Sequence, residues 1–135
     1  MAEDKPEVLA RPARVLIVED DPDMRDTLLF VLSEEGYEVR TAASLAEALD
    51  LLDQLAFQLV LTDLFDSGGE DPLRTVEELR QRAQATPVAV MTGWNMNSRA
   101  VEEAGYAFLL AKPYDLEFLM ARVAQCVRPS PQPER

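Results

Sequence analysis

Four short, mostly apolar runs each lead into a residue with a reactive side chain, and this pattern limits the folds available to the chain. The runs are residues 15–18, 57–62, 88–91 and 107–111, and they lead into Glu19-Asp20, Asp63, Thr92 and Lys112 respectively. Runs without regular polar alternation predict strands buried on both faces, as in a parallel sheet covered by helices. Because such strands end at one sheet edge, where ligands bind, we expect these side chains to share a site suited to chemistry on phosphate.

The segments between these runs have the pattern of helices, and a further strand is predicted near residues 38–42. Asp21-Pro22 predicts an N-cap followed by proline at the first helical position, and Gly36 predicts the end of that helix. Ser44 and Glu47 have the spacing of a capping box. Further helices are predicted around Leu73, Val76 and Leu79, at residues 97–104, and after Asp115 with Leu116, Leu119, Met120, Val123 and Val127 facing the core. Strands and helices alternate, which predicts an α/β three-layer sandwich of five strand–helix units.

The ends of the chain differ in composition from this alternating region. Residues 1–12 contain five charged residues and two prolines, and residues 128–135 contain three prolines and no apolar anchor. We therefore expect a flexible leader at 1–12, one domain at 13–127 and an extended proline-rich tail at 128–135.

Charge and composition exclude several classes of function. The formal net charge is −12, from 13 basic and 25 acidic residues, which argues against binding to nucleic acid or to anionic membranes. The chain has no histidine, which excludes histidine-based catalysis, histidine metal ligands and a histidine phosphodonor of its own. Its one cysteine cannot form an internal disulfide, and no segment has the apolar length of a membrane span. We expect a cytoplasmic protein.

Taken in order, the strand-end motifs resemble those of the response-regulator receiver domains of two-component signalling. The motifs are Val18-Glu19-Asp20-Asp21, Leu61-Thr62-Asp63-Leu64, Met91-Thr92-Gly93 and Ala111-Lys112-Pro113-Tyr114, and the resemblance covers roughly residues 13–127. It implies a flavodoxin-like (βα)5 fold with a parallel five-stranded sheet in the order 2-1-3-4-5.

The resemblance also implies a role for each acid of the predicted site. Asp63 is expected to be the phosphoacceptor, because a carboxylate is a ready nucleophile and an acyl phosphate remains reactive. Asp20 and Asp63 are expected to bind Mg²⁺ directly, together with the backbone carbonyl of Phe65, and Glu19 is expected to act through water. Magnesium prefers oxygen ligands and would relieve the repulsion among these carboxylates. Asp21 is more simply explained as a helix cap.

Residues at the other two strand ends complete the expected site. Lys112 is expected to pair with Asp63 and later with the phosphoryl group, and Thr92 is expected to donate a hydrogen bond to a phosphoryl oxygen. Gly93 leaves room for that group. Pro113 follows the lysine, and the family usually has a cis peptide bond here.

Some positions depart from the usual pattern of the family. An aromatic residue is common three positions before the lysine, where this chain has Leu109, and Phe108 is expected on the opposite side of the strand. Phe65 and Trp94 occupy two positions that tune phosphoryl lifetime, and neither can orient an attacking water. We expect them to shield the acyl phosphate and slow its hydrolysis. The loop after Asp63 also lacks the usual proline four residues on.

The implied function is that of a phosphoacceptor receiver, which slowly hydrolyses its own aspartyl phosphate but is not a conventional enzyme. A partner histidine kinase or phosphotransfer protein would donate the phosphoryl group to Asp63. We expect no output domain within these 135 residues, so the altered surface would act by binding an output protein. The sequence leaves open whether the chain forms a homodimer.

Two alternatives compete with this interpretation. A pseudo-receiver would keep the fold as a protein-interaction module without using phosphorylation. The leucine at position 109 and the altered loop after Asp63 favour it somewhat, and the intact acids, Thr92 and Lys112 count against it. A phosphatase of the haloacid dehalogenase type would need a second acid two residues after its nucleophile, where this chain has Phe65. The phosphatase is therefore strongly disfavoured.

Overall fold

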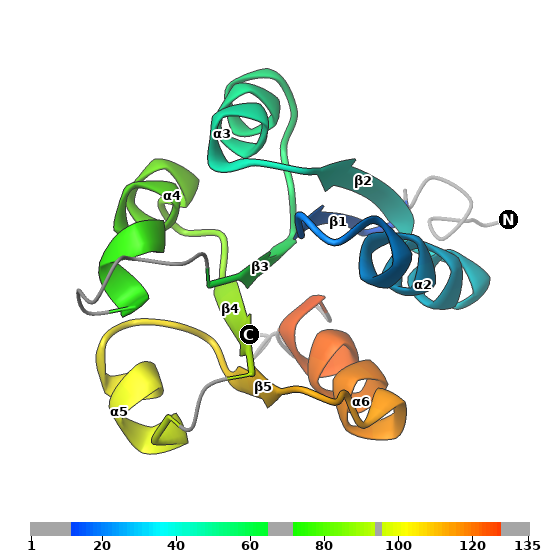
Figure 1. The fold of residues 1–135 in the computed structure, drawn as a ribbon. Coiled ribbons are helices and arrows are strands. Elements are labelled where there is room, and N and C mark those ends of the chain that lie inside the picture. Colours follow the sequence, from blue (N-terminus) through cyan, green and yellow to red (C-terminus); the bar gives the residue numbers. More distant parts are fainter. Residues whose placement is uncertain (1–11, 65–71, 94–95, 128–135) are drawn as a thin grey trace, which may run out of the picture.

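The computed structural model describes residues 12–64, 72–93 and 96–127, and it contains a parallel sheet between two layers of helices (Figure 1). The strands are β1 (Arg14–Val18), β2 (Glu38–Ala42), β3 (Leu59–Asp63), β4 (Val88–Thr92) and β5 (Leu109–Ala111). They lie in the order β2-β1-β3-β4-β5, and every neighbouring pair is parallel. The fold and strand order implied by the resemblance are confirmed.

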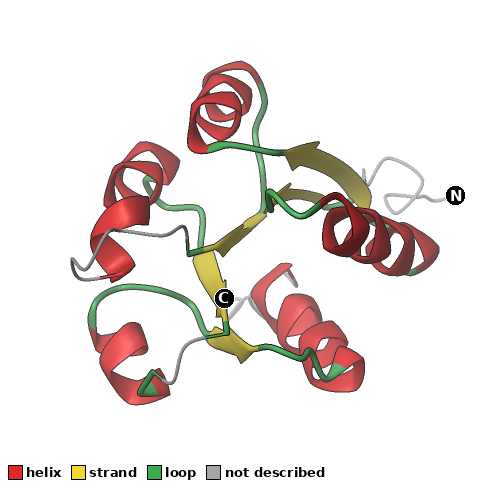
Figure 2. Cartoon of the chain, viewed as in Figure 1, coloured by secondary structure: helices red, strands yellow, loops and turns green. Residues whose placement is uncertain are grey.

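Helices cover both faces of this sheet, as right-handed crossovers between parallel strands require (Figure 2). Helices α2 (Pro22–Glu34) and α6 (Leu116–Val127) lie on one face. Helices α3 (Leu45–Gln54), α4 (Glu77–Ala83) and α5 (Ser98–Glu103) lie on the other, and a 3-10 helix, η1 (Pro72–Val76), leads into α4. None of the helices in these described segments has the length and apolar character needed to cross a lipid bilayer.

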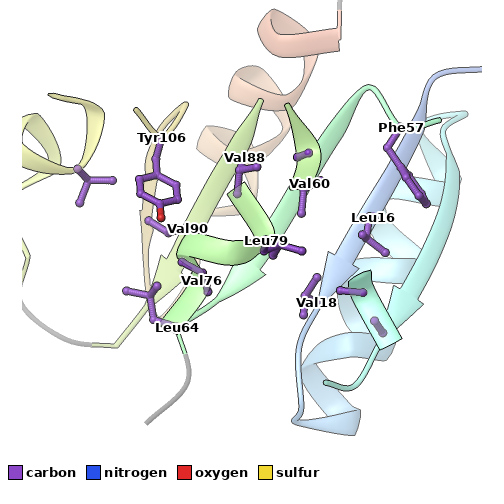
Figure 3. Packing of buried hydrophobic residues seen from close by; sticks show 14 residues of the cluster. Leu16, Val18, Phe57, Val60, Leu64, Val76, Leu79, Val88, Val90 and Tyr106 are labelled. Carbon is purple, nitrogen blue, oxygen red and sulfur yellow. The ribbon is translucent and has the colours of Figure 1, made fainter. Parts of the chain in front are cut away.

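Two apolar clusters form the core, one on each face of the sheet. On the face of α3, α4 and α5, Leu16 and Val18 of β1 pack with Val60 of β3 and with Val88 and Val90 of β4 (Figure 3). The residues between them in each strand point to the other face, where they pack against α2 and α6. This alternation within uninterrupted apolar runs explains why the strands show no polar period in the sequence.

Capping groups fix where the helices begin, largely as the sequence predicts. The side chains of Asp21, Ser44 and Asn97 accept hydrogen bonds from backbone N–H groups in the first turns of α2, α3 and α5. Asp115 does the same for α6, with N–O distances of 3.1 and 3.2 Å. Gly36 follows α2 with φ of 98°, a left-handed conformation that favours glycine after a helix end.

Some predicted details are wrong, and others concern residues that the structure does not describe. The helix predicted around Leu73, Val76 and Leu79 divides into η1 and α4. Leu116, predicted to face the core, is 39% exposed at the first position of α6, whose buried residues are Leu119 and Val123. The predictions for the leader up to residue 11, for the tail 128–135, and for Phe65 and Trp94 lie outside the described residues.

The turn between α4 and β4 contains a strained residue and yields a stability prediction. The N–H of Thr86 donates to the carbonyl of Ala83 at 3.0 Å, and Gln84 lies between them with φ of 58° and ψ of −114°. These angles belong to the first central position of a type II′ turn, which glycine normally occupies. A side chain there costs about 1–3 kcal/mol.

We therefore expect Gln84→Gly to raise the free energy of unfolding by about 1 kcal/mol, after allowance for the greater freedom of glycine in the unfolded chain. Urea denaturation monitored by circular dichroism measures this change. Gln84→Ala keeps the Cβ atom and should give no such gain. A glycine variant less stable than the wild type would contradict the prediction.

Candidate functional site

The candidate site lies at the carboxyl edge of the sheet, where four strands end beside one another. Register places Val18 opposite Thr62, Asp63 opposite Met91, and Thr92 opposite Ala111. Asp63 is the last residue of β3 rather than the first residue after it. Because the strand ends are level, the residues that follow β1 and β5 also reach this edge, as the sequence predicts.

Three carboxylates converge at this edge. Glu19, Asp20 and Asp63 each place one oxygen within 4.8 Å of the others. Glu19 is fully buried, Asp63 is 9% exposed, and Asp20 is exposed, so the group opens to solvent on the side of Asp20. Oxygen donors of this number and charge fit a hard divalent cation such as Mg²⁺, which keeps several water ligands.

Lys112 brings a positive charge to the same site. Its ammonium donates to Asp63 Oδ1 at 3.1 Å and lies 3.5 Å from Glu19 Oε1. Its backbone N–H donates to the carbonyl of Thr92 at 2.8 Å, which anchors the start of the loop after β5. Partial burial acts to lower the pKa of Lys112, but the hydrogen bond and charge of Asp63, with the charge of Glu19, outweigh it and raise that pKa. The side chain is therefore a cation at neutral pH.

Glu19 accepts hydrogen bonds from several elements, and two of the donors, Arg25 and Tyr114, are residues whose role the sequence pattern does not predict. Its Oε2 accepts from the backbone N–H of Asp21 at 3.2 Å, and its Oε1 accepts from the hydroxyl of Tyr114 at 3.3 Å. Arg25 on α2 donates to the carbonyl oxygen of Glu19 at 2.9 Å. Tyr114 stands in a motif quoted above, two residues after Lys112, and that proximity was the available signal. Nothing in the sequence marked Arg25.

Burial and charge shift the ionisation of this group. Burial raises the pKa of Glu19, and the negative charge of Asp63 adds to this, against opposing effects from the Asp21 N–H and from Lys112. Burial and then the charges of Glu19 and Asp63 raise the pKa of Tyr114, so its phenol keeps its proton and remains a donor.

A raised pKa for Glu19 predicts how the stability of the metal-free protein depends on pH. Folding favours the protonated form, so this contribution to stability is present below the unfolded pKa, about 4.3, and is lost as the pH rises through the folded value. Above that value the ionised side chain opposes folding. In EDTA at neutral pH, Glu19→Gln should be more stable than the wild type, and the difference should disappear near pH 4. Denaturation at several pH values measures this, and a variant less stable at pH 7 would contradict it.

The remaining predicted residues take the positions that the sequence indicates where the structure describes them. Thr92 is 2% exposed at the end of β4, and a Cβ atom at Gly93 would meet nothing within 4 Å. The Lys112–Pro113 peptide bond is cis. Leu109 packs with the cluster on the face of α3, α4 and α5, and Phe108 is buried in the opposite cluster.

Comparison with known proteins places the chain among response regulators. The family profile described as the response regulator receiver domain matches residues 15–124. The chain is 37% identical over 119 residues to the response regulator protein PilR of Pseudomonas aeruginosa, covering 85% of this chain and 26% of PilR. It is 34% identical over 119 residues to the response regulator MprA of Mycobacterium sp. (strain KMS), covering 87% of this chain and 51% of MprA. The chain thus spans about a quarter to a half of these relatives.

Solved structures agree with this placement. A two-component response regulator from Clostridium difficile superposes with a TM-score of 0.75 at 25% identity, covering 86% of this chain and 96% of that one. The response regulator TrrA from Thermotoga maritima, solved in complex with Mg²⁺ and BeF, has a TM-score of 0.71 at 25% identity, with coverages of 84% and 98%. With the profile match over most of its length, the 2-1-3-4-5 sheet and the acids and lysine at its carboxyl edge, the chain belongs to the response regulator receiver domain family.

Proposed function

We propose that Asp63 accepts a phosphoryl group from a histidine of a partner kinase or phosphotransfer protein, and that this changes a surface that binds other proteins. The observation that carries the proposal is the position of Asp63, whose carboxylate lies beside two further acids and 3.1 Å from an ammonium group. Such an arrangement suits a carboxylate that accepts a phosphoryl group, because a neighbouring cation can offset the negative charge that the group brings. Receiver domains of this family generally serve as phosphorylation-dependent signalling modules rather than conventional enzymes.

The transfer needs little from the protein beyond positioning. A carboxylate oxygen of Asp63 forms the new P–O bond while the P–N bond to the donor histidine breaks, and the leaving imidazole nitrogen keeps the electron pair and takes up a proton from water. Lys112 is already at hydrogen-bond distance from Asp63 and would pair with the incoming phosphoryl oxygens. Thr92, at the adjacent strand end, would donate its hydroxyl to another of them.

The acids around Asp63 would hold Mg²⁺ during this reaction. Asp20 and Asp63 would be direct ligands and Glu19 would act through water, since Glu19 is buried and already accepts hydrogen bonds on both oxygens. When bound, Mg²⁺ supplies positive charge that offsets the repulsion between these carboxylates and the phosphoryl oxygens. The similar response regulator TrrA was solved in complex with Mg²⁺ and BeF, which supports the binding of Mg²⁺ but does not assign its ligands.

The surface that would respond lies on β4, β5 and the helices beside them. Thr92 and Lys112 join these strands to the site, because the Lys112 N–H donates to the Thr92 carbonyl. On α6, the apolar side chains of Leu116 and Phe118 are 39% and 44% exposed, so a partner could contact them. We propose that an output protein binds this surface in a phosphorylation-dependent way.

A second function is favoured by one observation, the side chain at position 109. A leucine packed against the core has no aromatic ring whose rotamer could follow the state of Thr92, so the switch between the threonine and an aromatic side chain that the resemblance implies would not operate in this chain. The alternative is a module that binds its partner without regard to phosphorylation.

Titration with beryllium fluoride in the presence of MgCl₂, followed by ¹H–¹⁵N NMR, tests both proposals. The aspartyl-phosphate analogue should shift amide resonances of the carboxyl edge and of β4 and β5, and should raise the melting temperature by several degrees. Fluoride and MgCl₂ without beryllium are the control. Shifts confined to residues next to Asp63, with none in β5 or α6, would support the alternative. No binding at all would contradict the phosphoacceptor proposal.

A further inference from the structure

Tyr114 lies between the two halves of the proposed site. It follows Lys112 and Pro113 after β5, and its partly buried ring packs against the core cluster on the face of α2 and α6. The ring is thereby fixed by the core, while its hydroxyl and one of its faces point toward charged groups of the carboxyl edge. The sequence pattern alone assigns this residue no role.

The hydroxyl of Tyr114 contacts the acidic half of the site. It donates to Glu19 Oε1 at 3.3 Å, and the Asp21 N–H donates to the other oxygen, Oε2, at 3.2 Å. Glu19 has no exposed surface. A buried carboxylate bonded on both oxygens by groups from opposite sides has its plane fixed, so the direction in which it can face a bound cation is fixed as well.

The ring of Tyr114 contacts the cationic half. The ammonium of Lys112 lies 5.9 Å from the ring centroid, within the range of a cation–π interaction, and the same ammonium bonds to Asp63 at 3.1 Å. Lys112 and Glu19 themselves lie 3.5 Å apart. The side chain of Tyr114 therefore contacts both Glu19, which belongs to the proposed metal site, and Lys112, which would pair with the phosphoryl group.

We infer that Tyr114 is a positioning residue that orients Glu19 for Mg²⁺ binding through its hydroxyl and supports Lys112 through its ring. This rests on the proposed function, because it assigns Tyr114 to that same site. A phenylalanine would fill the same volume and keep the ring, so a role in packing alone predicts no change on loss of the hydroxyl. A role in positioning predicts weaker metal binding.

The first test compares Mg²⁺ dissociation constants by NMR titration with MgCl₂. Tyr114→Phe should raise the dissociation constant about tenfold, the usual scale for losing a residue that orients a ligand. Tyr37→Phe is the matched control, since it removes a phenolic hydroxyl beside the amino end of β2, away from the site. Combined with Glu19→Leu, Tyr114→Phe should cause no further loss.

The second test measures the same contact without metal or phosphate. In EDTA, Tyr114→Phe should raise the equilibrium constant for unfolding about fivefold in the otherwise wild-type protein, and much less in the Glu19→Leu background, which has no oxygen to receive the bond. With acetyl phosphate as donor, Tyr114→Leu should slow phosphorylation of Asp63 more than Tyr114→Phe does, because only the leucine removes the ring beside Lys112.

The outcomes separate this inference from the function on which it rests. If the wild type binds Mg²⁺ and Tyr114→Phe binds it equally well, the positioning role is overturned and the proposed function stands. Equal effects of Tyr114→Phe in the wild type and in Glu19→Leu would also overturn it. If the wild type binds neither Mg²⁺ nor beryllium fluoride, the proposed function fails and the positioning role fails with it.

Discussion

Asp63→Asn is expected to abolish phosphorylation of this protein. An asparagine keeps the size and shape of the side chain, but its amide is a very poor nucleophile toward phosphorus. After incubation with acetyl phosphate and MgCl₂, intact-protein mass spectrometry should find one added phosphoryl group on the wild type. The variant should show less than about a hundredth of that amount, since the covalent step has no substitute nucleophile.

Two controls make this result specific to the site. Asp53→Asn removes an exposed acid of α3, which pairs with Arg82 at 3.0 Å, and it should leave phosphorylation unchanged. Circular dichroism should show that Asp63→Asn remains folded, because the change keeps the volume of the side chain and reduces repulsion with Glu19. A phosphoryl group on the folded Asp63→Asn protein would mean that another residue is the acceptor.

The sequence allows much of the fold to be predicted because four of the five strands lie in mostly apolar runs and four helices begin at a side-chain cap. The exceptions are β2, which contains Glu38 and Arg40, and α4, which has no side-chain cap. Asp21, Ser44, Asn97 and Asp115 all accept backbone hydrogen bonds at the predicted helix starts. These signals are local, since a cap is decided by a few neighbouring residues. The strand order is different in kind: it came from the resemblance, and no residue pattern in the chain would have given it.

The errors concern features that depend on tertiary contact. Leu116 follows the apolar spacing of α6, yet it is 39% exposed. Spacing predicts which side of a helix faces the core, but not which of its turns contact the sheet. Ala107 was predicted to be in β5, whose register begins only at Leu109, although the Ala107 N–H still donates to Val88 at 2.7 Å. A hydrogen bond between neighbouring strands can thus lie outside the residues that pair in register. The sequence pattern does not distinguish residues with such a bond from residues that belong to the strand.

The residues of the site also differ in whether local sequence or tertiary contact determines their role. Glu19, Asp63 and Lys112 were predictable because each follows or ends a buried run, and register alone brings such residues together. Arg25 and Tyr114 were missed because each acts through contact with a different element: Arg25 reaches back from α2 to the Glu19 carbonyl, and Tyr114 reaches across from the loop after β5. A tyrosine after Lys-Pro reads equally well as a packing residue until its hydroxyl is seen to meet a buried acid.

Phosphorylation should depend on Mg²⁺, and Asp20→Asn should remove most of that dependence. Asp20 is the exposed member of the three acids, so its carboxylate is the one most open to a hydrated cation. Loss of this ligand should raise the Mg²⁺ dissociation constant about 10- to 100-fold. The rate with acetyl phosphate should fall to the level of the wild type in EDTA, and added MgCl₂ should restore little of it.

Asp21→Asn is the matched control, because it replaces a carboxylate oxygen of the adjacent acid with an amide nitrogen, as Asp20→Asn does at its own position. Asp21 caps α2 by accepting from the Asp23 N–H at 3.0 Å, and asparagine caps a helix about as well as aspartate. Its Mg²⁺ affinity and its phosphorylation rate should therefore stay close to those of the wild type. If Asp21→Asn lost Mg²⁺ binding while Asp20→Asn kept it, the roles of the two neighbours would be exchanged, with Asp21 as the ligand.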